Sequence, residues 1–170
     1  MNLRFISKLK TDARTPLKVV PTNVILGFIG GFITIFSLAY LTEWSKITWL
    51  MAPFGASCVL AFAVWDAPLS QPRNIIGGHF LSTLVGILCL KIFGNHPWVI
   101  ALGVGLAISL MVLTKTTHPP AGADPIVVIL GNFSWNYLIS PVLIGSVVVV
   151  VLAILVNNFT SKRKYPSFWL

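Results

Sequence analysis

The residues of this chain best suited to chemistry lie in one polar segment, Thr117-His118-Pro119-Pro120-Ala121-Gly122-Ala123-Asp124. Two consecutive prolines cannot sit inside a regular helix, because each removes a backbone donor and clashes with the preceding turn. They can open a helix, where the missing N–H would have no partner anyway. In lipid, such a break is tolerated only where protein or a water-filled cavity surrounds it. We therefore expect this segment to line a site or a pathway.

A second segment repeats the pattern. Residues 53–57, Pro-Phe-Gly-Ala-Ser, resemble residues 120–124, Pro-Ala-Gly-Ala-Asp, and an apolar run follows each. We expect each segment to consist of an extended stretch, at about 47–52 and 114–119, followed by a short helix that starts near mid-membrane. Two helix N-termini that meet there would bind a small anion through their unpaired N–H groups and partial positive charges. Chance similarity between two packing Gly-Ala pairs is the other explanation.

The predicted substrate-binding residues belong to these two segments or to the start of the third apolar span. The glycines leave room for a ligand to approach the backbone, the hydroxyls can donate, and the basic side chains supply positive character. Arg73 could instead contact lipid headgroups, His79 could bond a carbonyl, and His118 could cap the short helix. The set is Pro53, Gly55, Ala56, Ser57, Arg73, His79, Thr117, His118, Pro119, Pro120, Gly122, Ala123 and Asp124.

Composition assigns the chain to the membrane. Hydrophobic residues make up 56% of its 170 residues and charged residues only 9%, whereas soluble domains carry roughly a quarter charged residues. Apolar runs long enough to cross a bilayer recur, at about 23–42, 47–65, 74–93, 98–113 and 137–156, with a shorter one at 125–130. The sequence therefore predicts an all-α polytopic membrane protein with about six crossings, of which the second and fifth are broken and short.

Charge indicates the topology. The net charge is +8, and most of it flanks the spans, which is the positive-inside pattern and not a nucleic-acid signature. Six crossings put both termini on one side with Arg73 and Lys115, so we expect a multi-pass protein of the cell (inner) membrane with cytoplasmic termini. The predicted parts are a basic segment 1–22, a transmembrane domain 23–157 and a basic tail 158–170. The domain divides into three-helix halves of inverted topology, 23–95 and 96–157, a plan common in secondary transporters.

Several motifs resemble those of the HPP family of integral membrane proteins. They are residues 117–123, 53–57, 68–74 (Pro-Leu-Ser-Gln-Pro-Arg-Asn), 77–79 (Gly-Gly-His) and the pair Asn157-Asn158. The resemblance implies a transporter, and plant plastid and cyanobacterial members of the family are linked to nitrite. Asp124 stands where the family is expected to have a small or hydroxyl residue. Its carboxylate would oppose an anion unless it turns away, pairs with a cation such as Lys115, or is protonated.

The sequence thus favours a channel or carrier for a small inorganic anion, nitrite first. Its expected partners are that anion and the lipid bilayer, with a homo-oligomer left open. A proton-coupled carrier is attractive because His79, His118 and Asp124 could titrate. The alternatives are a cation pathway that uses Asp124 and a non-transporting membrane scaffold.

Other functions find little support in the sequence. We expect no enzyme, because the four carboxylates and three histidines show no catalytic spacing. We expect no cofactor and no metal site either. Cys58 and Cys89 fall inside apolar spans and are interpreted as small buried hydrophobic residues.

Overall fold

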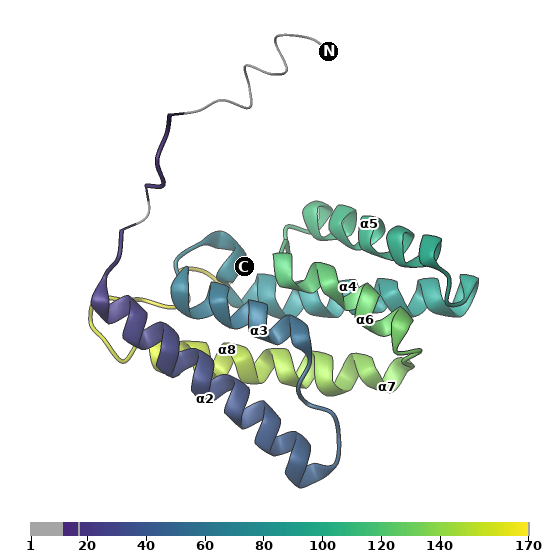
Figure 1. Ribbon diagram of the computed structural model, residues 1–170, viewed down its shortest axis with the longest axis horizontal. Coiled ribbons are helices and arrows are strands. Elements are labelled where there is room, and N and C mark those ends of the chain that lie inside the picture. The colour runs from purple at the N-terminus through teal and green to yellow at the C-terminus, as the bar shows by residue number, and fades with distance from the viewer. Residues whose placement is uncertain (1–11, 17, 170) are drawn as a thin grey trace.

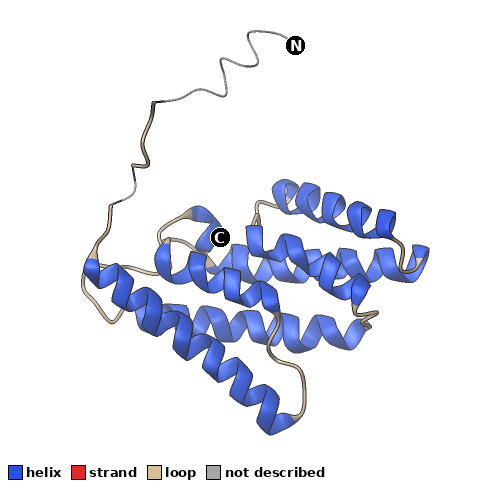
Figure 2. Ribbon diagram, in the orientation of Figure 1, coloured by secondary structure: helices blue, strands red, loops and turns tan. Residues whose placement is uncertain are grey.

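The computed structural model describes residues 12–16 and 18–169 of the chain. Arg4, Lys8 and Lys10 of the predicted basic N-terminal segment lie outside the described residues. The described part consists of helices and connecting loops, with no strand (Figure 2). The prediction of an all-α membrane protein is confirmed.

Six apolar helices correspond to the six predicted segments. Three are long and apolar enough to cross a membrane: Pro21–Ser45, which is α2, Pro72–Phe93, which is α4, and Trp135–Asn157. Three are shorter: Ala52–Ala63, Pro97–Leu113 and Pro119–Leu130. The second and fifth are indeed the short ones, at about a dozen residues each.

The second, fifth and last of these helices are composite. The second contains α3, Ala52–Cys58, and a π-helical turn η1, Val59–Ala63; a 3₁₀ turn η2, Pro68–Ser70, follows it. The fourth is α5, Pro97–Leu113, and the fifth joins a 3₁₀ turn η3, Pro119–Ala123, to α6, Asp124–Leu130. The last comprises α7, Trp135–Tyr137, the π-helical η4, Leu138–Leu143, and α8, Ile144–Asn157.

Proline sets most of the helix starts. A proline occupies the first or second position of α2, α3, α4, α5, η3 and α6, where its missing N–H would have no partner and its fixed φ suits the helix. The first span begins earlier than predicted because Pro21 opens it. It ends at Ser45, and the next residue, Lys46, adopts a left-handed conformation (φ 59°). The predicted second span shrinks to 52–63 because residues 46–51 are not helical.

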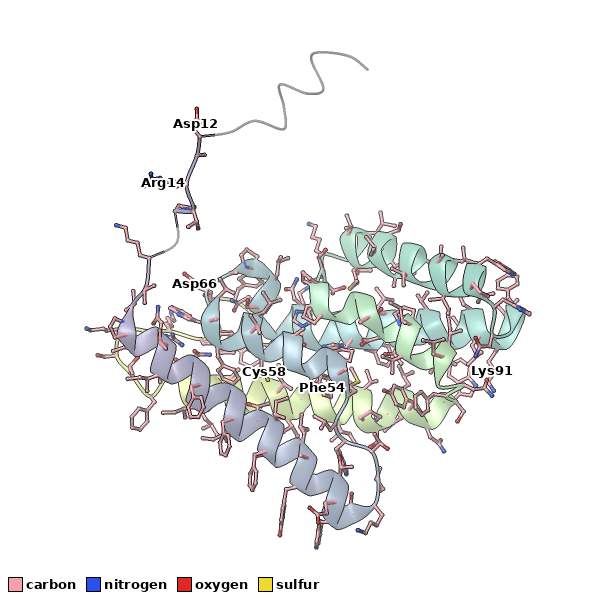
Figure 3. All side chains as sticks on the ribbon, viewed as in Figure 1. Asp12, Arg14, Phe54, Cys58, Asp66 and Lys91 are labelled. Atoms are coloured by element: carbon pink, nitrogen blue, oxygen red, sulfur yellow. The ribbon has the colours of Figure 1, made fainter. Side chains whose placement is uncertain are left out.

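Helix α4 lies at the centre and packs against α5, α6, η3, η4 and α8. Figure 1 shows the chain running back and forth, with the start of α2 and the C-terminal tail at the same end. Figure 3 places Asp66 at that end and Lys91 at the other. Helix α2 approaches η1 closely at Gly30, where an added Cβ would lie 2.3 Å from the Phe62 ring. At Gly27 and Gly31 an added Cβ would meet nothing within 4 Å.

Candidate functional site

The two short helices begin beside each other in the middle of the bundle. Non-helical residues precede both, at 46–51 and 114–118, as predicted. Helix α3 starts beside η3, and from there α3 and the η3–α6 helix run in opposite directions (Figure 1). A surface groove of about 630 Å³ lies between them, lined by Ala52, Pro53, Ala56, Val59, Leu60, Pro119, Pro120, Ala123 and Val127. The two motifs that the sequence singled out therefore form one feature.

Ser57 joins the two short helices to α4. Its Oγ lies 2.8 Å from Nε2 of His79 and 2.8 Å from Nε2 of His118, and it is 3.2 Å from the Pro53 carbonyl one turn back. The side chains of Ser57, His79 and His118 have no exposed surface. One hydroxyl thus lies between two imidazoles in the interior of the bundle.

His79 continues the chain of hydrogen bonds to α6. Its Nδ1 lies 2.8 Å from Oδ2 of Asp124, and both side chains are fully buried. Asp124 therefore pairs with His79 and not with Lys115, which was one of three possibilities that the sequence left open. The other carboxyl oxygen, Oδ1, is buried without a hydrogen-bond partner among the described residues.

His118 ends this chain of hydrogen bonds at η2, the 3₁₀ turn before α4. Its Nδ1 lies 2.8 Å from the Leu69 carbonyl, which can only accept, so Nδ1 carries a proton. If His118 is neutral, its Nε2 accepts the proton of Ser57, and Nε2 of His79 must then donate to Ser57. One further proton is needed between Asp124 and Nδ1 of His79. The distances therefore require a carboxylate with an imidazolium or a carboxylic acid with a neutral imidazole, and the pair is net neutral in both.

Neighbouring residues hold this cluster in position. Ser82 donates to the Ala121 carbonyl at 2.6 Å, and Asn74 Nδ2 donates to the Thr117 carbonyl at 2.9 Å. Gly78 allows the segment before η3 to approach α4, since an added Cβ would lie 2.7 Å from Cβ of His118. The Phe54 ring stands edge-on to the His79 ring, with centroids 5.1 Å apart. The Gly-Gly-His motif was the only sequence signal for Gly78, and nothing in the sequence pointed to Ser82.

Not all the predicted binding residues meet here. Arg73 donates to the Thr114 carbonyl at 2.9 Å and lines a separate pocket with Lys115. Thr117 donates weakly to the Met111 carbonyl. Gly55 and Gly122 have open space where a Cβ would stand. The structure thus joins Ser57, His79, His118 and Asp124 in one cluster and sets Arg73 apart from it.

The described residues contain no group of three His, Cys, Asp or Glu side chains arranged to hold a metal ion. Cys58 and Cys89 are free and buried. The continuous hydrogen bonds from Asp124 through His79 and Ser57 to His118 are suited to proton transfer.

The chain is similar in sequence to known membrane proteins. The family model described as "HPP, transmembrane region" matches residues 16–166. Two curated transmembrane proteins of Dictyostelium discoideum are similar. DDB_G0273707/DDB_G0273361 is 35% identical over 98% of this chain and 58% of its own length. DDB_G0269096 is 39% identical over 71% of this chain and 45% of its own length. The chain therefore spans about half the length of these relatives. No solved structure matches.

Proposed function

The chain belongs to the HPP family of transmembrane proteins, and from this premise we propose that it transports a small inorganic anion across the membrane together with a proton. Nitrite is the favoured substrate, on the link drawn for other family members. The observation that carries the proposal is the buried chain from Asp124 through His79 and Ser57 to His118, which lies where the two short helices meet. Ionisable groups inside a membrane domain are costly and mark ion or proton pathways.

The backbone supports an anion at the same place. Broken helices whose N-terminal ends point toward a common site are the means by which several transporter folds hold anionic groups near the midplane. Here α3 and η3 start side by side, and α3 and the η3–α6 helix run in opposite directions (Figure 1). We propose that they are the middle members of two inverted halves, 23–95 and 96–157.

Protonation of the cluster would supply the positive charge that the groove lacks. In the neutral state Ser57 donates to His118. An added proton on Nε2 of His118 would turn the Ser57 hydroxyl to the Pro53 carbonyl, 3.2 Å away, so that both imidazoles donate to its oxygen. The cluster then carries one positive charge beside the helix starts. Release of the proton restores neutrality and removes the attraction for the anion.

The lining of the groove favours such joint movement. All nine of its side chains are apolar, and a bare anion in apolar surroundings has a large desolvation penalty. An anion that moves with one proton is a neutral unit. We therefore propose symport of one monovalent anion with one proton, which transfers no net charge across the membrane.

Three other functions fit less well. Asp124, His79 and Ser57 follow the order of a hydrolase triad, but Ser57 has no exposed surface and its hydroxyl also binds His118. A cation pathway would need Asp124 to face the ion, whereas its Oδ2 is held by His79. A scaffold without transport activity would not require the buried chain of polar side chains, which is costly inside a membrane domain.

The basic residues support an orientation as well. The tail with Lys162, Arg163 and Lys164 follows α8 at the end of the bundle where α2 begins (Figure 1). Arg73 and Lys115 line a pocket together with Phe168 of the same tail. By the positive-inside rule this end faces the cytoplasm. We propose a multi-pass protein of the cell membrane with cytoplasmic termini.

The test is nitrite uptake into vesicles that contain the purified protein. We expect uptake to rise with an inward proton gradient and to be unaffected by membrane potential. Protein-free vesicles give the background, because nitrous acid itself crosses lipid, and vesicles with the Ser57→Ala variant control for leak through inserted protein. Uptake above background that does not depend on the proton gradient would exclude proton coupling. Uptake no greater than background would exclude nitrite as the substrate.

A further inference from the structure

A second pocket lies at the basic end of the bundle, away from the buried cluster. Its volume is about 620 Å³, and it is formed by the start of α2, the end of η1 with the loop after it, and the tail after α8. Its polar lining residues are Thr22, Asn23, Asp66, Thr160, Ser161, Lys162 and Arg163. Nothing in the proposed transport step uses this pocket.

The pocket is suited to an anionic group. Lys162 and Arg163 contribute two cations, and Thr22, Thr160 and Ser161 contribute hydroxyl donors. Helix α2 has 25 residues, and its first turn has neither a side-chain cap nor an acidic residue, so its partial positive charge is uncompensated. Asp66 is the one opposing charge in the lining.

Arg163 is an unusual residue for an exposed tail. It is only 6% exposed, it donates to the Phe62 carbonyl, Asn157 and Asn23, and its guanidinium carbon lies 5.6 Å from the Trp65 ring centre. Its Nε has no hydrogen-bond partner among the described residues. A buried guanidinium with a free N–H donor is suited to a phosphate oxygen.

An apolar groove continues from the pocket into the membrane domain. It has a volume of about 360 Å³, lies between α2 and α8, and shares Leu26 and Phe159 with the pocket. Its other lining residues are Ile29, Ile33, Leu155 and Val156. From Leu26 to Ile33 it follows α2 for about 10 Å, at 1.5 Å per residue. A basic polar pocket joined to an apolar groove is complementary to a phospholipid, with the headgroup in the pocket and an acyl chain in the groove.

We propose that this composite site binds one anionic glycerophospholipid. The phosphodiester would lie against Lys162, Arg163 and the start of α2, and an acyl chain would occupy the groove. Asp66 repels a headgroup that carries a further negative charge, but its carboxylate accepts hydrogen bonds from hydroxyl groups. Phosphatidylglycerol, with one negative charge and a glycerol headgroup, therefore fits the site better than phosphatidic acid.

The test is native mass spectrometry of the detergent-purified full chain with phosphatidylglycerol, phosphatidic acid, phosphatidylcholine and soluble glycerol phosphate. We expect one tightly held phosphatidylglycerol and weaker occupancy by the other three. The exposed Lys162→Gln variant should weaken binding on the order of fivefold, the effect of about one basic residue at an anionic membrane surface. Lys164→Gln, which removes an equal charge outside the pocket, should leave binding unchanged.

A second pair of variants tests the acyl groove. Ile33→Trp fills the groove and should reduce occupancy by phosphatidylglycerol, whereas Val24→Trp, at an exposed position outside the groove on the same helix, should not. The proposed anionic site would be wrong if phosphatidylcholine bound as tightly as phosphatidylglycerol, or if Lys162→Gln and Lys164→Gln weakened phosphatidylglycerol binding equally. Binding of glycerol phosphate as tight as that of the lipid, or no effect of Ile33→Trp, would overturn the lipid as its occupant.

Discussion

Ser57 Oγ lies 2.8 Å from Nε2 of His118, although 61 positions separate the two residues in the chain. The bond links α3 to the extended residue that precedes η3. The same oxygen lies 2.8 Å from Nε2 of His79, so Ser57 bridges the two histidines. Because Ser57 both donates and accepts, it can pass a proton between two imidazoles that do not bond each other directly. This relationship yields the first prediction.

Ser57→Ala should abolish proton-driven anion uptake while the protein still inserts and folds. The change leaves two buried imidazole nitrogens without a partner, for which we expect a loss of about 1–3 kcal/mol in the free energy of unfolding. Uptake into vesicles and thermal melting in detergent measure the two effects. Ser109→Ala, which removes an exposed hydroxyl bonded to the Gly105 carbonyl, is the control. Full uptake by Ser57→Ala would exclude the relay.

Asp124→Asn should separate proton coupling from anion binding. An asparagine can still donate to Nδ1 of His79 but cannot pass a proton to it, so protons no longer reach His118 from residue 124 through His79 and Ser57. We expect uptake driven by a pH gradient to be lost and exchange of labelled for unlabelled anion to persist. The exposed Glu43→Gln variant removes a carboxylate far from the cluster and should behave as wild type. A cation flux that collapses in Asp124→Asn would instead favour the cation pathway.

Gly78→Ala should distort the cluster without removing any of its polar groups. The added methyl group would lie 2.7 Å from Cβ of His118 and 2.9 Å from the Thr116 carbonyl, and such overpacking costs about 1–3 kcal/mol. Gly105→Ala is a matched control in α5, because its Cβ meets nothing within 4 Å. There we expect no loss, or a gain of up to about 1 kcal/mol from helix propensity. Melting temperatures that fall equally in both variants would contradict this account.

Tyr165 should make the stability of the tail sensitive to alkaline pH. Its hydroxyl donates to the Ser70 carbonyl at 2.8 Å, and burial raises its pKa above the ordinary value. The protonated phenol is therefore favoured in the folded state. Its contribution to stability is complete below the ordinary pKa of about 10 and declines as the pH rises above that value.

Melting curves between pH 8 and pH 11, taken as approximate limits around the ordinary tyrosine pKa, test this contribution. Tyr165→Phe should lower the melting temperature at neutral pH, because the Ser70 carbonyl loses its donor, and should show a smaller further loss at alkaline pH than the wild type. A Tyr165→Phe protein with the same alkaline loss as the wild type would assign that loss to other groups.

Much of the fold was predictable because it depends on local properties of the chain. Hydropathy identifies the apolar helices segment by segment, and the prolines mark where helices start. The same reasoning predicted that extended stretches at about 47–52 and 114–119 precede two short helices. It missed the bend in the last helix, where Ser140 has non-helical dihedral angles before Pro141, since a single proline does not by itself show how a buried helix will accommodate it.

The functional site was predictable only in part. Ser57, His79, His118 and Asp124 could be selected as unusual residues for a membrane span, but not joined to one another. Arg73 looked equally suitable and lies apart from them, while Arg163 looked like one more tail cation and is buried.

The sequence by itself determined that this chain enters a membrane as six helical segments, two of them broken by proline, because burial of apolar surface in lipid and the backbone limits of proline act over a few consecutive residues. Only the tertiary structure decided which side chains meet. Hydrogen bonds between residues 22, 45 and 61 positions apart depend on how each helix is rotated and how closely it approaches its neighbours. Those quantities follow from packing around α4, where small residues such as Gly78 let the polar segments come within bonding distance.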